Sequence, residues 1–270
     1  MFGISLDLNK ALFIEVIKAP KALITGLIAQ WAVLPFLTYI LIVVTKPQAS
    51  IALGMILVAA CPGGNISNFF SSLAKANVEL SIVMTCVSSV LAIILTPLLL
   101  TFYGNLYGPT REIMKVVSLD WWEVMQAILL IIVIPIIVGQ IFVKIFPNIA
   151  IRIKSFLRVA SMLLFVLIVI GAFAANYDYF LSYIALVFFV VLLHNFIAIL
   201  SGLGMGKIMK LRQSDVKSIS IEVGIQNSGL GLLLIFSFFS GLGGMAIVAA
   251  WWGIWHIVTG FVLSFIWNKV

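Results

Sequence analysis

The chain has 270 residues, of which 63% are hydrophobic and 9% are charged, and its mean hydropathy is +1.25. Soluble domains carry about 25% charged residues, so this composition excludes a soluble globular protein and indicates an all-α, polytopic membrane protein. The net charge of +7 does not indicate nucleic-acid binding, because no basic-aromatic surface pattern accompanies it.

Apolar stretches long enough to cross a bilayer, about 20 residues each, recur along the chain. With the crossings assigned below, all but three of the 16 Lys and Arg residues fall on one side of the membrane. An excess of basic residues marks the cytoplasmic side, so we expect a multi-pass protein of the cell (inner) membrane with both termini in the cytoplasm. The eight predicted crossings are Ala22–Val44, Ile51–Leu73, Val78–Phe102, Trp122–Phe146, Ser155–Ala174, Phe180–Met205, Ser214–Ser240 and Met245–Trp267.

The second and seventh of these crossings are interrupted. Pro62 and two glycines precede Asn65 in the second, and Gly224 precedes Asn227 in the seventh. Proline and glycine interrupt a helix, and asparagine is a favourable N-cap for a helix that restarts. Paired interrupted helices at corresponding positions predict the binding site of a secondary transporter. Their similar flanking helices also indicate two five-helix repeats, of which the first would lack one helix and most of a second.

Glu222 lies within the seventh crossing, where an ionisable residue costs at least about 2.5 kcal/mol. The Lys and Arg residues map to loops and to the ends of the predicted crossings, so a bound cation is the expected compensation. Ser81, Thr85, Ser88 and Ser89 share one face of the third crossing, and such oxygen ligands suit a hard cation such as sodium. Two alternatives stay open: Glu222 could be protonated or paired, and the serines could serve only close helix packing.

The remaining polar residues give weaker signals. His194, Asn195 and His256 are most simply interpreted as buried groups that hydrogen-bond to helix carbonyls. The sequence contains no phosphate loop, no HExxH motif and no nucleophile elbow, so we do not expect an enzyme.

Two long segments, "CPGGNISNFFSSLAKANVELSIVMTCVSSVLAIILTP" and "IEVGIQNSGL", resemble the two signature regions of the bile acid:sodium symporter family. "GLIAQ", "LLHN" and "WH" match as well. The resemblance implies an inverted-repeat transporter fold of ten helices, with a core domain, a panel domain and two discontinuous helices that cross. Against this pattern the chain begins within the second helix, so about eight spans are expected. Residues 1–19 would hold a remnant of that helix and a cytoplasmic loop, 20–103 the core helices of the first repeat, 104–178 the panel helices of the second repeat, and 179–270 its core helices.

The resemblance also implies two sodium ions and names candidate ligands for them. The first sodium site would comprise Ser67, Asn68, Ser81, Thr85 and Glu222. The second would comprise Gln30, Glu222, Gln226 and the backbone carbonyls of Val223 and Ile225. Substrate contacts would come from Asn65, Asn227 and His256. Asn65 and Ile257 replace a threonine and an asparagine that are frequent in the family, which leaves the substrate open.

The function predicted from these residues is sodium-coupled symport of an organic anion, such as a bile acid, pantoate or a 2-oxo acid, by alternating access. One alternative is a proton-coupled carrier or cation/proton antiporter in which Glu222 carries the proton. A membrane sensor that binds ligand without flux is a rival of a different class. The expected partners are sodium, the anion and the lipid bilayer, with no nucleic acid, and the expected oligomeric state is a monomer.

Overall fold

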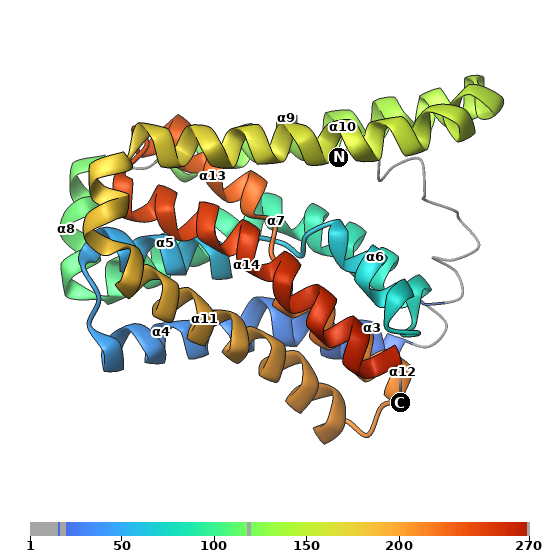
Figure 1. Cartoon of the computed structure of the whole chain (residues 1–270), viewed down its shortest axis with the longest axis horizontal. Coiled ribbons are helices and arrows are strands. Elements are labelled where there is room, and N and C mark those ends of the chain that lie inside the picture. Colours follow the sequence, from blue (N-terminus) through green and yellow to red (C-terminus); the bar gives the residue numbers. More distant parts are fainter. Residues whose placement is uncertain (1–15, 17–19, 118–119, 269–270) are drawn as a thin grey trace.

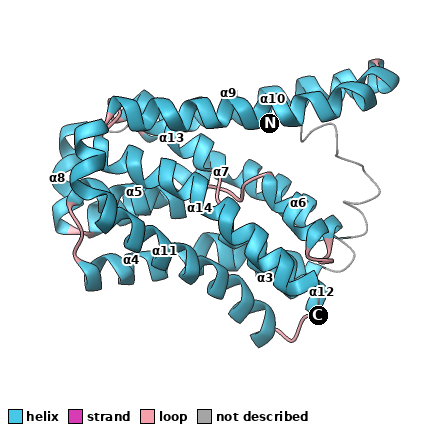
Figure 2. Cartoon of the chain, viewed as in Figure 1, coloured by secondary structure: helices cyan, strands magenta, loops and turns pink. Residues whose placement is uncertain are grey.

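The computed structural model describes residues 16, 20–117 and 120–268. Within these residues nearly every position is helical and no strand is present, so the prediction of an all-α protein is confirmed (Figures 1 and 2). Apart from Val16, the predicted helix remnant and loop at 1–19 lie outside the described residues. The elements are α3 (Pro20–Ile28), η1 (Ala29–Val33), α4 (Leu34–Thr45), α5 (Ala49–Ala59), α6 (Ile66–Leu73), α7 (Val78–Leu106), α8 (Gly108–Val117), α9 (Trp121–Ile145), α10 (Pro147–Ala175), α11 (Tyr177–Ile208), α12 (Gln213–Gly224), α13 (Ser228–Phe238) and α14 (Gly243–Asn268).

In the described part of the chain, five helical stretches are long and apolar enough to cross a membrane. They confirm a multi-pass membrane protein, while the count of eight crossings stays a prediction. Shorter apolar helices include α5 and α13, each of which is the apolar half of an interrupted pair, α5–α6 and α12–α13. The five long stretches are Pro20–Thr45, Val78–Leu106, Trp121–Ile145, Phe180–Ile208 and Gly243–Asn268.

Both predicted interruptions are present, and the two breaks lie against each other. The backbone N–H of Gly64 donates to the carbonyl of Ile225 at 2.6 Å, and that of Asn227 donates to the carbonyl of Pro62 at 2.9 Å. Gly63 and Gln226 form an antiparallel bridge between these two bonds. Backbone groups inside a membrane need internal partners, so each break supplies the hydrogen bonds that the other has lost.

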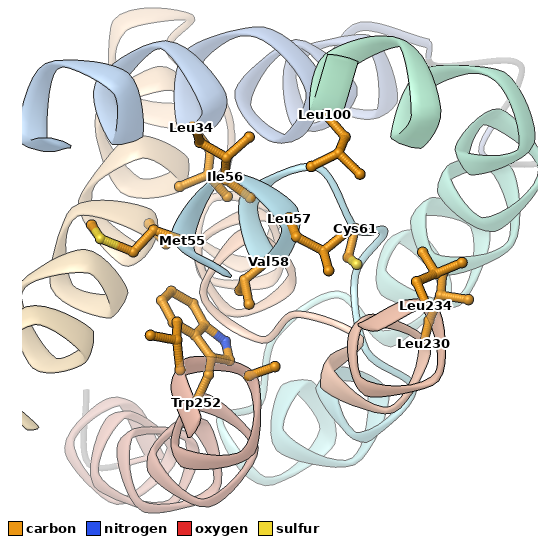
Figure 3. Close-up of a cluster of buried hydrophobic side chains, with 14 of the residues drawn as sticks. Leu34, Met55, Ile56, Leu57, Val58, Cys61, Leu100, Leu230, Leu234 and Trp252 are labelled. Atoms are coloured by element: carbon orange, nitrogen blue, oxygen red, sulfur yellow. The ribbon is translucent and has the colours of Figure 1, made fainter. Parts of the chain in front are cut away.

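The apolar core surrounds α5, in which nine of the eleven residues are buried. Figure 3 shows its side chains converging with others from α4, α7, α13 and α14. A Cβ atom at Gly54 would lie 2.9 Å from Cα of Met245, so α5 and α14 approach as closely as only a glycine allows. The labelled residues of this cluster are Leu34, Met55, Ile56, Leu57, Val58, Cys61, Leu100, Leu230, Leu234 and Trp252.

Two elements were not expected from the sequence. The first crossing contains the π-helical segment Ala29–Val33, directly before Pro35. Proline has no N–H to donate to the preceding turn, which accounts for the local change in hydrogen bonding. The second element, α8, is a short amphipathic helix whose charged residues are exposed while Thr110 and Met114 are buried. Its charged residues interrupt the apolar pattern by which the crossings were predicted, so the helix was not expected.

Candidate functional site

Glu222 lies near the end of α12, just before the second break, and its side chain is fully buried. Its Oε1 accepts a hydrogen bond from Oγ1 of Thr85 at 2.7 Å. Its Oε2 accepts hydrogen bonds from the hydroxyls of Ser67 and of Ser81, the latter at 3.1 Å. Three helices, α6, α7 and α12, therefore bring their polar side chains to one carboxyl group.

The side chain of Asn68 completes this cluster. Its Oδ1 accepts from the hydroxyl of Ser81 at 2.8 Å and from that of Thr85 at 3.3 Å. Each hydroxyl has one hydrogen, so Ser81 shares it between Glu222 and Asn68. Thr85 shares its hydrogen among Glu222, Asn68 and the backbone carbonyl of Ser81, which lies at 2.9 Å. The structure thus brings together all five residues predicted for the first sodium site. Carboxylate, hydroxyl and amide oxygens are ligands that suit a hard cation, so this donor set fits sodium.

A glycine is required beside this carboxyl group. A Cβ atom at Gly63 would overlap Oε1 of Glu222 and would lie 2.8 Å from its Cδ. In the described part of the chain the one salt bridge joins Lys115 to Glu112, so no cationic side chain compensates Glu222. The site therefore combines a buried acid with converging oxygen atoms, and it leaves no space for a side chain at position 63.

Gln30, in the π-helical segment, faces Gln226 in the second break. Nε2 of Gln30 donates to Oε1 of Gln226 at 2.9 Å, and Nε2 of Gln226 donates to Oε1 of Gln30 at 3.1 Å. The same amide of Gln226 donates to the carbonyl of Val223 at 2.6 Å, and Nε2 of Gln30 donates to that of Cys61 at 2.9 Å. Three residues predicted for the second sodium site are thus in direct contact.

The other two members of that predicted site, Ile225 and Glu222, form their hydrogen bonds with other residues. The carbonyl of Ile225 accepts from Gly64, although a carbonyl oxygen has a second lone pair that could face an ion. Glu222 forms its hydrogen bonds with the first cluster, and among the described residues none joins it to Gln30 or Gln226. The geometry therefore supports the first set of ligands more directly than the second.

Two of the residues predicted to contact substrate, Asn65 and Asn227, directly precede the half-helices α6 and α13, and the third, His256, lies on α14. Oδ1 of Asn227 accepts from the backbone N–H of Leu230 at 3.1 Å, so Asn227 caps α13 as predicted. The expectation that Asn65 caps α6 is wrong, because its backbone is already helical and its side chain makes no capping bond. Asn65 is exposed, which leaves its amide free. His256 is buried on α14, and its Nδ1 has no hydrogen-bond partner within the described residues.

His194 and Asn195 are buried side by side in the sequence of α11. Oγ1 of Thr38 lies 2.8 Å from the carbonyl of Leu34 and forms a hydrogen bond of 2.7 Å with Nε2 of His194, in which the tautomer of the imidazole sets the donor. The partner of His194 is therefore a hydroxyl and not the helix carbonyl that we expected. Asn195 Nδ2 does donate to a helix carbonyl, that of Gly224 at 2.7 Å, where α12 ends.

A polar cluster at the beginnings of α7 and α12 was not expected from the sequence. Asn77 caps α7, and its Nδ2 donates to Oδ1 of the buried Asp215 at 2.7 Å. An asparagine directly before an apolar run that carries Glu79 in its first turn is a helix-start signal, and it could have identified Asn77. Nothing in the sequence indicates that Asp215 meets it.

Comparison with known proteins places this arrangement in a family. The profile of the Sodium Bile acid symporter family matches residues 1–183. YocS of Bacillus subtilis (strain 168), described as an uncharacterized sodium-dependent transporter, is 36% identical over 269 residues, which cover 100% of this chain and 80% of YocS.

Two plant proteins of Arabidopsis thaliana are also similar. "Probable sodium/metabolite cotransporter BASS5, chloroplastic" is 30% identical over 88% of this chain, and "Probable sodium/metabolite cotransporter BASS1, chloroplastic" is 27% identical over 100% of it. The chain spans 59% of the length of BASS5 and 65% of that of BASS1. The profile match over two thirds of the chain and the identity to YocS show that the chain belongs to the sodium bile acid symporter family.

Proposed function

We propose that the protein is a sodium-coupled symporter of a small organic anion, such as a bile acid, pantoate or a 2-oxo acid, that works by alternating access. The observation that carries this proposal is the buried carboxyl group of Glu222 on α12, surrounded by hydroxyl and amide oxygens from α6 and α7. The names of YocS and BASS5 support it, because they describe sodium-dependent transport and sodium/metabolite cotransport.

One sodium ion would bind Glu222 together with oxygens of Ser67, Asn68, Ser81 and Thr85. A buried carboxylate without a cationic partner costs several kcal/mol, and a bound cation removes most of this cost. The hydroxyls now donate to the carboxyl group. Each could rotate its hydrogen away and turn a lone pair toward the ion without moving its helix.

A second sodium ion would bind between the two breaks. Its ligands would be Glu222, the amide oxygens of Gln30 and Gln226, and the carbonyls of Val223 and Ile225. The two amides hydrogen-bond to each other, so both would have to rotate before their oxygens face one ion. Binding of this ion is therefore coupled to the contact between the π-helical segment and the second break.

The substrate anion would bind beside these ions. Two sodium ions around one carboxylate leave a net positive charge, and the N-termini of α6 and α13 add partial positive charge and free N–H groups. Asn65 and Asn227, at those N-termini, and His256, on α14, would contact the anion. Because ion and anion binding are linked, a sodium gradient would then drive uptake.

We also propose that the fold is divided into core helices and panel helices. The core helices would lie in 20–103 and 179–270, and the panel helices in 104–178, as inverted repeats. Figure 1 supports this division, since α9 and α10 lie together along one edge of the molecule. We further propose a monomer in the inner membrane with both termini in the cytoplasm.

A proton-coupled carrier is the second candidate, and one observation favours it. The carboxyl group of Glu222 is fully buried and has no cationic partner in the described part of the chain, an environment that also suits a protonated acid. In that case the flux of substrate would follow the pH gradient and would not depend on sodium.

The test is uptake of a radiolabelled bile acid, pantoate and a 2-oxo acid into vesicles that contain the purified protein. An inward sodium gradient and an inward proton gradient are applied separately. We expect sodium to drive uptake of at least one anion, and we expect Glu222→Ala to abolish it. Glu123→Ala is the matched control, because Glu123 is an exposed acid in the first turn of α9. Uptake by Glu222→Ala equal to that of the wild type would refute the mechanism.

A further inference from the structure

A second polar cluster lies one to two helical turns from Glu222, where α7 and α12 begin. In Figure 1 this is the region around the α12 label, next to the end of α6. Asn77 occupies its centre. Oδ1 of Asn77 accepts from the backbone N–H of Leu80 at 3.0 Å, and Nδ2 donates to Oδ1 of Asp215 at 2.7 Å. One amide group therefore bonds to the first turns of both helices.

The backbone of Asn77 is bonded to α12 as well. Its N–H donates to the carbonyl of Ser214 at 3.1 Å, and its carbonyl accepts from Oγ of Ser218 at 2.6 Å. Asp215, between these two residues, is only 8% exposed although it is an acid. Such a buried carboxylate needs donors, and the amide of Asn77 is one of them. The start of α7 is thus joined to α12 by three hydrogen bonds at one residue.

These bonds set the register of α7 against α12. Ser81 follows Asn77 by four residues, and Glu222 follows Ser218 by four residues, which is about one turn or 6 Å along each helix. The bond between Ser218 and Asn77 and the bond between Ser81 and Glu222 are therefore successive contacts between two helices that run in the same direction. Thr85, one turn further along α7, reaches the other oxygen of Glu222.

A change of register would separate these groups. Moving α7 by one residue along its axis shifts its side chains by about 1.5 Å and turns them by about 100°. The bond from Thr85 to Glu222 is 2.7 Å long, and a hydrogen bond is lost beyond about 3.5 Å, so it would not survive such a shift. The contacts at Asn77 are the ones that oppose this movement at the beginning of both helices.

We propose that Asn77, through its bond to Asp215, is a positioning residue that holds Ser81 and Thr85 in register with Glu222 and so sets the affinity of the transporter for sodium. This inference rests on the proposed sodium coupling. Within the described residues, the one hydrogen bond between Asn77 and a predicted sodium ligand is that from the backbone N–H of Ser81 to the carbonyl of Asn77, at 3.2 Å. The effect of Asn77 is therefore transmitted by the position of α7.

The test measures the sodium concentration that gives half-maximal uptake into vesicles of whichever radiolabelled anion, a bile acid, pantoate or a 2-oxo acid, the wild type transports. Asn77→Asp keeps the oxygen that caps α7 but places a second carboxylate against Asp215. We expect the half-saturating sodium concentration to rise about tenfold, as for other residues that orient metal ligands. Asn77→Ser, which adds no charge and keeps a capping oxygen, is expected to raise it as well and serves if Asn77→Asp does not fold.

The exchanged double variant, Asn77→Asp with Asp215→Asn, separates positioning from simple loss of stability. The amide at position 215 then donates to the carboxylate at position 77, whose other oxygen still caps α7. Net charge is unchanged, and we expect the half-saturating sodium concentration to return to within about twofold of the wild type, since the bond is restored.

Ser220→Ala is the matched control, because Oγ of Ser220 donates to the carbonyl of Ile199 on α11 at 2.8 Å and not to α7. It should lower the melting temperature but leave sodium dependence unchanged. The proposal is overturned if Ser220→Ala and the Asn77 variants raise the half-saturating concentration equally, or if the exchanged pair gives no recovery. Wild-type uptake without sodium dependence would refute the proposed function itself, whereas unchanged sodium dependence in both Asn77 variants would refute only the positioning role.

Discussion

Replacing Gly63 by alanine is expected to weaken sodium binding without unfolding the protein. The added Cβ would overlap Oε1 of Glu222 and would lie 2.8 Å from its Cδ and 3.1 Å from its Cγ. Carbon atoms in proteins approach to roughly 3.5 Å, so the side chain of Glu222 must move by more than about 0.5 Å. Gly63 does not have the left-handed backbone that only glycine favours, so the effect comes from this contact alone.

The size of the effect follows from the bonds that Glu222 would lose. Its carboxyl group is held by hydroxyls from three directions, and the bond from Ser81 is already 3.1 Å long. A shift of this size breaks at least one of these bonds, and a hydrogen bond to a charged group contributes about 1.5–3 kcal/mol. A loss of 1.4 kcal/mol corresponds to about a tenfold weaker affinity. We therefore expect the half-saturating sodium concentration to rise at least about tenfold.

The assay is uptake into vesicles over a series of sodium concentrations, with Gly231→Ala as the control. A Cβ at Gly231 would lie 3.7 Å from Sγ of Cys61 and 3.9 Å from Cβ of Ala249, which are ordinary contacts. This variant makes the same chemical change in the neighbouring half-helix α13 and should behave as the wild type. If Gly63→Ala has the same sodium dependence as Gly231→Ala, then the carboxyl group of Glu222 does not have to stay where the structure places it, and the reasoning fails.

Two further predictions test the site and the fold separately. Ser81→Ala combined with Thr85→Ala removes two of the hydroxyls on Glu222 and should weaken sodium affinity at least about tenfold, measured as the sodium dependence of uptake; unchanged dependence would remove both residues from the site. Lys75 follows α6 with a φ of 51°, in the left-handed region, so Lys75→Gly should raise stability by about 0.5–1 kcal/mol in thermal unfolding, with sodium dependence unchanged. A lower melting temperature would show that the bond from Lys75 to the carbonyl of Asn268 matters more than the backbone strain.

Much of the secondary structure could be predicted because it depends on local properties of the sequence. The long apolar runs predict the spans, and the segment from Pro62 to Gly64 predicts the first break, since proline and glycine act on their own turn of helix. The same reasoning failed at Asn65, whose capping role depends on backbone angles that its residue type does not determine. It also missed the π-helical segment before Pro35, because proline inside a transmembrane helix can be accommodated in several ways.

The residues that meet at Glu222 could be named from the sequence, but the way in which they contact one another could not. The sequence alone establishes that Glu222 is an acid in an apolar segment without a basic neighbour, and this follows from the cost of burying charge. Only the tertiary structure decides that Ser67 and Thr85, 155 and 137 residues away, donate to the same carboxyl group, and that Asn77 meets Asp215. Contacts between distant segments depend on how helices pack and on their register, and neither is encoded in a local pattern. The contact between the two breaks creates the site. It brings the ends of four half-helices, α5, α6, α12 and α13, and their polar side chains to one place in the protein.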